Sequence, residues 1–126
     1  MYGYKKETGL PYEDAVEKVR EELKKEGFGV LTEIDVKATL KKKLGVDFDK
    51  YIILGACNPP NAYKALKAER DIGLMLPCNV IVYEKDGKTT ISAINPTIAM
   101  QMIKNEKLRG IAQEIETKLK RAVDNV

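Results

Sequence analysis

Two apolar runs, each joined to a Cys-Asn pair, constrain the fold of this chain more than any other feature. The first run ends at Cys57 and Asn58, and the second begins directly after Cys78 and Asn79. Both runs carry apolar side chains at consecutive positions, which predicts central strands of a sheet. If these strands are antiparallel neighbours, the end of the first lies beside the start of the second. The two Cys-Asn pairs then meet at one edge of the sheet.

Asn58 also marks the start of a predicted helix. Asn is a favoured N-cap residue and Pro is favoured in the first helical turn, so Asn58-Pro59 predicts a helix from Pro60 to about Glu69. The inward face of this helix is expected to hold Ala62, Ala65 and Leu66. A helix N-terminus lowers the pKa of a nearby thiol and attracts anions. This corner between strand and helix is therefore the best candidate for a site.

The rest of the chain alternates between helical and strand patterns. Apolar spacing predicts helices over residues 11–25, 36–44 and 108–126, and strands over 2–6, 28–35 and 88–94. The dipeptide Asp86-Gly87 predicts a hairpin turn. The apolar segment Ile72–Leu76 is broken by a glycine, so we interpret it as an extended connection. A helix that opens at Asn95-Pro96 is expected to turn Ile98 and Met102 inward.

This order of elements predicts an α+β fold in a single domain that spans residues 1–126. We expect a mostly antiparallel sheet of about five strands, with the helices packed on one face. A chain of 126 residues can bury one core but is too short for two independent ones. The uncovered face of the sheet is expected to be partly apolar, which favours a homodimer.

The composition excludes several kinds of chemistry. The chain has no histidine, which excludes Ser-His-Asp catalysis, Cys-His catalysis and His-ligated metal. Two cysteines cannot complete a structural zinc site, so we expect no metal and no cofactor. A net charge of +3 makes nucleic-acid binding the weakest hypothesis. No apolar run is long enough to span a membrane, so we expect a cytosolic protein without a membrane partner.

One set of motifs is distinctive when taken together. Its members are Glu13–Val16, Gly27–Val36, Leu54–Pro60 with Ala62 and Ala65-Leu66, Leu76–Val80, and Asn95-Pro96. In this combination the chain resembles the domain-of-unknown-function family 302. The resemblance implies an α+β domain similar to a single copy of the TATA-box-binding-protein fold, homodimers, and no established activity. Other branches of that family carry other residues where Cys57 and Cys78 stand and Asp where Asn95 stands, so the resemblance implies no obligatory thiol chemistry.

These observations support two hypotheses for the function. The first is a small dimeric binding module in the cytosol, whose ligand or partner site is formed by Cys57, Asn58, Cys78 and Asn79. The second is a thiol-based redox or soft-metal site, of the kind that binds Cu(I), using Cys57 and Cys78. A structural interpretation stands beside both, because a free cysteine in an apolar strand is usually a small buried side chain and an Asn before Pro is usually a cap. No residue is assigned a catalytic role.

Overall fold

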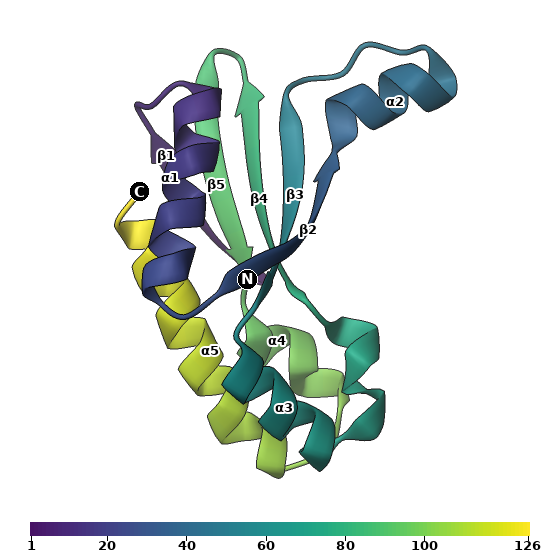
Figure 1. The fold of residues 1–126 in the computed structure, drawn as a ribbon, viewed down its shortest axis with the longest axis vertical. Coiled ribbons are helices and arrows are strands. Elements are labelled where there is room, and N and C mark those ends of the chain that lie inside the picture. Colours follow the sequence, from purple (N-terminus) through teal and green to yellow (C-terminus); the bar gives the residue numbers. More distant parts are fainter.

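A five-stranded antiparallel sheet forms the centre of the computed structural model, which describes residues 1–126 (Figure 1). The strands are β1 (Gly3–Thr8), β2 (Gly29–Asp35), β3 (Tyr51–Cys57), β4 (Cys78–Lys85) and β5 (Lys88–Ile94). They lie in the order β1-β5-β4-β3-β2, and every neighbouring pair is antiparallel. The predicted α+β fold with about five antiparallel strands is confirmed.

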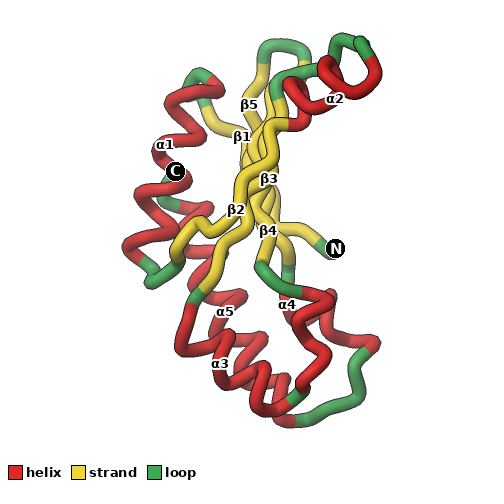
Figure 2. The backbone as a smooth tube through the Cα atoms, turned by 45° about the vertical axis from the view of Figure 1, so that its right-hand side comes forward, coloured by secondary structure: helices red, strands yellow, loops and turns green.

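Helices α1 (Tyr12–Lys25) and α5 (Lys107–Asp124) cover one face of the sheet (Figure 2). Both helices are amphipathic, and each turns one row of apolar side chains toward the strands. Acidic residues begin α1 and lysines end it, which is the arrangement that the helix dipole favours. None of the helices is both long enough and apolar enough to cross a membrane.

The main core lies between these two helices and the sheet, and it contains seventeen buried side chains. Leu54, Val80 and Ile91 lie on three neighbouring strands and face inward. Leu23 of α1 and Leu119 of α5 pack against them, and all five side chains are at most 1% exposed. Because side chains alternate along a strand, the neighbours of these inward-facing residues in β3, β4 and β5 turn to the opposite face of the sheet.

Beyond one end of the sheet, the chain forms a smaller helical region that we call the lobe (Figure 1). It consists of α3 (Pro59–Ala68), the 3-10 helix η1 (Arg70–Met75), α4 (Pro96–Ala99), the 3-10 helix η2 (Met100–Met102) and the first half of α5. These elements surround a second core of five buried residues, Ala65, Ile72, Met100, Leu108 and Ala112. The lobe therefore has its own small core beside the main one.

Helix α2 (Val36–Leu44) extends from the sheet as an arm, on the side opposite α1 and α5 (Figure 2). The carboxylate of Asp35 caps its first turn by accepting a hydrogen bond of 2.9 Å from the backbone N–H of Ala38. Gly45 ends the helix in the left-handed conformation, with φ of 68°. None of the residues of α2 is buried, so its apolar side chains pack against little of this chain.

Three predictions about the lobe were wrong. Residues 72–76 were expected to be extended, but residues 70–75 form η1, and Ile72 is fully buried in the lobe core. A 3-10 helix is short and does not show the 3.6-residue apolar period of an α-helix. The apolar residues around Gly73 therefore gave no sign of helical structure in the sequence.

The helix after Asn95 is the second correction. It ends at Ala99 and continues as η2, and this change from α to 3-10 geometry alters which residues point inward. Met100 is buried, whereas Ile98 and Met102 are 38% and 79% exposed. Leu66 of α3 is likewise 42% exposed, although it was expected to face inward.

Candidate functional site

The antiparallel pairing of β3 and β4 brings the two Cys-Asn pairs together. In the register of these strands, Ala56 lies opposite Cys78 and Gly55 lies opposite Asn79. Cys57 is the last residue of β3 and Cys78 is the first residue of β4. The end of one strand therefore lies beside the start of the other, as the connectivity predicted.

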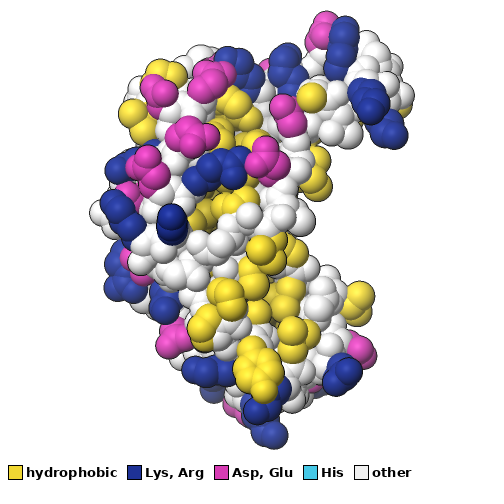
Figure 3. Space-filling view, in the orientation of Figure 1, with side chains coloured by type: hydrophobic (Ala, Val, Ile, Leu, Met, Phe, Trp, Pro, Cys, Tyr) yellow, Lys and Arg dark blue, Asp and Glu magenta, His cyan; other side chains and the backbone are white.

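An apolar groove of about 300 Å³ opens at this point, between the end of β3, helix α3 and the segment that leads into β4. We call it the corner groove. It is lined by Cys57, Asn58 and Cys78, together with apolar residues that include Leu31, Leu66 and Pro77. Figure 3 shows apolar atoms gathered over this part of the molecule, below the sheet. Ten of the thirteen lining residues are hydrophobic and none is charged.

Asn58 lines the groove, but its amide is engaged inside the protein. Its Oδ1 accepts hydrogen bonds from the backbone N–H and the Nδ2 of Asn61, at 3.4 and 3.1 Å. Its Nδ2 donates to the backbone carbonyl of Glu26, at 3.3 Å. The predicted N-cap of α3 is confirmed, and the same side chain also ties the lobe to the turn between α1 and β2. These bonds leave the Asn58 amide little capacity for a ligand.

Gly27 makes room for this contact. Its φ of +85° lies in the left-handed region that favours glycine. A Cβ at this position would also lie 3.2 Å from the Nδ2 of Asn58, which is tighter than ordinary van der Waals contact. The glycine thus allows both the turn after α1 and the close approach of the Asn58 amide.

Asn79 lies on the other side of the sheet from the main core. Cys78 and Val80 are buried in that core, so alternation along β4 turns Asn79 to the opposite face, where it is exposed. On the same face, Thr32 and the ring of Pro77 pack so closely over Gly55 that no Cβ would fit there. Asn79 does not line the corner groove, whereas the other three candidate residues do.

The two thiols differ in their surroundings. Cys78 is 6% exposed, and Cys57 is half-buried. Burial raises the pKa of the Cys78 thiol to about 11, and the neighbouring Cys57 adds to this increase. Cys78 therefore keeps its proton near pH 7 and is a poor nucleophile there. No group of three or more His, Cys, Asp or Glu side chains is arranged to hold a metal ion.

Several residues of the groove were not predicted from the sequence. Leu31 reaches it from a β-bulge in β2, where the register shifts between Val30 and Thr32. Leu76 and Pro77 contribute from the segment before β4, and Ile115 contributes from α5. The Leu-Pro step before Cys78 was a usable signal, because proline favours an extended connection beside a strand. A bulge leaves no comparable signal in the sequence.

Comparisons with known proteins agree on a family. The model of the family described as "Domain of unknown function DUF302" matches residues 4–126. The chain is also similar to a solved structure, the crystal structure of uncharacterized conserved protein DUF302 from Bacillus stearothermophilus, with 35% sequence identity and a TM-score of 0.93. That similarity covers 99% of this chain and 98% of the other. No curated protein matches the chain.

Proposed function

The chain belongs to the DUF302 family, as its motifs predicted, and because the family description states no activity, we propose a function from the corner groove itself. We propose that the protein is a binding module that takes a small, uncharged, apolar molecule into this groove. The observation that carries the proposal is the lining, in which apolar side chains surround the two thiols and no charged group is present.

The size of the groove suits such a ligand. A dry apolar cavity of about 150 Å³ is large enough for benzene, and small-molecule sites begin at about 300 Å³. The corner groove, at about 300 Å³, is therefore matched to a molecule of roughly two rings. Two of its lining residues, Leu31 and Leu66, are 68% and 42% exposed. A ligand that covers these side chains removes apolar surface from water, which favours binding.

The test uses the uncharged two-ring fluorophore 6-propionyl-2-(dimethylamino)naphthalene, whose emission shifts to shorter wavelength in apolar surroundings. We expect saturable binding to the wild-type protein. Ala62 lines the groove from α3 and is half-buried, so Ala62→Leu should fill part of the space. The fluorophore would then bury less apolar surface, by an amount equal to about two methylene groups, and its affinity should be about tenfold lower.

Lys64→Leu is the matched control. Lys64 lies on the same helix, is exposed and does not line the groove, so this variant adds an equally large apolar side chain elsewhere. It should bind the fluorophore as the wild type does. Equal affinities for the wild type and a folded Ala62→Leu variant, or no saturable binding at all, would refute a ligand site in the groove.

A homodimer is the second part of the proposal, and the α2 arm supports it. The arm and the loop after it expose Leu44, Val46 and Phe48 by 70%, 45% and 42%. A free helix of nine residues is marginal in water, so such a helix usually gains its stability from packing. We propose that a second copy of the chain covers these residues.

The uncovered face of the sheet continues this apolar surface. The rings of Tyr51 and Tyr83 stack there with centroids 5.5 Å apart, and Phe48 lies 6.2 Å from Tyr51. Ile34 and Ile53 are register partners, and alternation along β3 places them on the same face. An apolar surface that joins a sheet face to a projecting helix is typical of an interface between subunits.

Sedimentation velocity tests the dimer. Leu44→Asp should shift the protein toward the monomer, because a carboxylate would be buried in the interface. Thr39→Asp adds the same charge to an exposed position elsewhere on α2 and should leave the dimer intact. A wild-type protein that stays monomeric at high concentration would contradict the dimer, and so would a Leu44→Asp variant with unchanged association.

The thiol-based alternative has less support in the geometry. It needs Cys57 and Cys78 as thiolates, whereas burial raises the pKa of Cys78 to about 11. Alkylation with iodoacetamide at pH 7.5, followed by mass spectrometry, should modify Cys57 in the folded protein and leave Cys78 free. Rapid modification of both would favour the alternative.

A cytosolic location stays part of the proposal, because a reducing compartment keeps both thiols free.

A further inference from the structure

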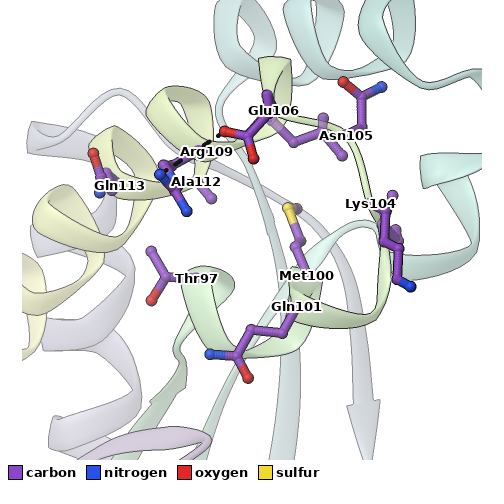
Figure 4. A pocket seen from close by; sticks show the side chains of 11 residues that line it. Thr97, Met100, Gln101, Lys104, Asn105, Glu106, Arg109, Ala112 and Gln113 are labelled. Carbon is purple, nitrogen blue, oxygen red and sulfur yellow. Dashed lines mark ion pairs between the residues drawn. The ribbon is translucent and has the colours of Figure 1, made fainter.

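A second hollow lies in the lobe, between η2 and the first half of α5 (Figure 4). Its volume is about 590 Å³. Met100, Leu108 and Ala112 of the lobe core line it, whereas Ala65 of the same core lines the corner groove. The two sites therefore share one small core but no lining residue.

Polar side chains stand around the apolar floor of this hollow. Figure 4 shows Thr97 and Gln101 on one side, Arg109 and Gln113 on the other, and Met100 between them. Thr97 already donates a hydrogen bond of 2.6 Å from its hydroxyl to Glu116. The amides of Gln101 and Gln113 take no part in the side-chain hydrogen bonds of the chain, and both residues are exposed.

Arg109 gives the hollow its main positive charge. Its Nη1 lies 3.8 Å from the Oε2 of Glu106, and the two side chains are 72% and 88% exposed, so this ion pair is loose. Lys104 at the rim has no carboxylate partner within ion-pair distance. Two cations and one carboxylate thus surround the hollow, which favours an anionic ligand.

The amino end of α5 adds little to this preference. The side chain and the backbone carbonyl of Asn105 accept hydrogen bonds from the backbone N–H groups of Lys107 and Leu108, at 3.0 and 3.1 Å. The backbone carbonyl of Glu106 accepts a hydrogen bond of 3.2 Å from the backbone N–H of Arg109. Because these donors are already used, the side chains of Arg109 and Lys104 are the groups left to bind an anion, and only Arg109 offers a planar pair of N–H donors.

We propose that this hollow is a second binding site, for a small aromatic monocarboxylate. Its carboxylate pairs with the guanidinium of Arg109, which offers two parallel N–H donors in the geometry that carboxylates fit. Its ring lies on the floor at Met100, where a thioether makes favourable contact with aromatic carbon. The amides of Gln101 and Gln113 supply further hydrogen bonds at the rim. This site goes beyond the proposed function, because its residues are separate from those of the corner groove.

Three ligands of similar shape and different charge test the proposal. We expect NMR titration of the wild-type protein to show that benzoate binds more tightly than uncharged benzamide, and that cationic benzamidine binds most weakly. The shifted backbone signals should be those of residues 97–113. Benzamidine binding as tightly as benzoate would overturn the proposal, and so would the absence of saturable shifts with benzoate.

Variants of the two charged residues give opposite predictions. Arg109→Gln should lower benzoate affinity about fivefold and remove its advantage over benzamide, because a charge-assisted hydrogen bond is lost. Glu106→Gln should raise benzoate affinity about twofold, since a competing carboxylate is removed. Lys107→Gln removes a positive charge from the same turn of α5 at a residue that does not line the hollow, and it should bind benzoate as the wild type does.

These outcomes separate a defined site from general attraction of anions. Equal losses in Arg109→Gln and Lys107→Gln would show that benzoate responds to net charge alone, and this would overturn the site. All three residues are exposed, so the variants are expected to keep the wild-type melting temperature. Failure of benzoate binding would leave the corner groove unaffected, because the fluorophore measures that groove separately.

Discussion

The main core and the lobe differ in how completely their elements cover one another. The main core buries seventeen side chains between a sheet and two long helices, whereas the lobe buries five between short helical segments. A sheet presents a continuous surface that helices can cover without gaps, but segments of three to ten residues leave spaces at their ends. Both the corner groove and the second hollow border the lobe core. The candidate binding sites therefore lie within the less completely packed region or at its boundary with the main core.

This comparison predicts different kinds of response to the truncation of a buried side chain. A defect in the main core should lower the stability of the whole domain, because the helices and the central strands share that core. A defect in the lobe should open the lobe first, since regions with few buried contacts unfold locally at lower free energy. The four predictions below test this difference, beginning with the largest effect.

Leu54→Ala should produce the largest loss of stability. Leu54 is fully buried on β3, a strand with a neighbour on each side, and removal of a leucine from such a core costs about 3–4 kcal/mol. Urea unfolding followed by circular dichroism should show a lower midpoint with an unchanged slope, because the whole domain unfolds together. A cost of less than about 1 kcal/mol would mean that the two regions are not as different as the packing suggests.

Ile72→Ala should cost less and act locally. Ile72 is fully buried in the lobe, but only four other buried residues share that core, so we expect a loss of about 2 kcal/mol. Hydrogen exchange should accelerate in α3, η1 and α4 while the strands stay protected. Binding of the fluorophore in the corner groove should weaken as well. Uniform loss of protection across the sheet would contradict a separate lobe.

The same difference explains which parts of the fold could be predicted. The main core follows from long periodic patterns, such as the inward row that contains Leu23 in α1 and Leu119 in α5. Ile72 and Met100 of the lobe lie in 3-10 segments that are too short to show a period, so their burial was missed. Prediction succeeded where an element was long enough to repeat its pattern.

The candidate site was predicted in part for a related reason. Cys57 and Cys78 lie together because consecutive strands, here joined through the lobe by residues 58–77, usually pair as neighbours in a sheet. Asn79 was placed in the same site, although alternation along β4 turns it away from the groove. Leu31 was missed because a bulge interrupts the alternation of β2. The positions of the site residues along the chain could be predicted, but the face of the sheet to which each side chain turns was not.

Cys78 belongs to the main core and also lines the corner groove, so its titration reports on the boundary between the two regions. Its pKa is raised from 9.0 to about 11. Between these values the unfolded chain releases a proton that the folded chain keeps, so the free energy of unfolding falls as the pH rises. The expected loss approaches about 1.4 kcal/mol per pH unit and disappears below about pH 8.

Cys78→Ala isolates this contribution. Lysine and tyrosine side chains titrate in the same pH range, but they do so in both proteins. The difference between the two free energies of unfolding should therefore narrow between pH 8 and 10.5, by about 1–2 kcal/mol. If the free energies of unfolding of the two proteins changed in parallel with pH, the Cys78 thiol would be accessible to water. Cys78 would then be part of the groove surface and not of the main core.

Asn58 is the direct link between the two regions, and Asn58→Asp tests the link with the smallest change. Aspartate is as good an N-cap as asparagine, so α3 keeps its cap. The introduced carboxylate cannot donate to the carbonyl of Glu26, and this partly buried bond of 3.3 Å is replaced by two facing acceptors. We expect a loss of about 1–2 kcal/mol, with faster hydrogen exchange at the turn between α1 and β2.

Acidification supplies the control for this variant, because a protonated carboxyl can donate the missing bond. The pKa of the introduced group should be raised in the folded state, so its penalty should shrink as the pH falls toward 4. Asn58→Ala removes both the cap and the donor, and its penalty should not change with pH in this way. A pH-independent penalty for Asn58→Asp would place the damage in the cap of α3. In that case the hydrogen bond between Asn58 and the carbonyl of Glu26 would contribute little to the connection between the lobe and the main core.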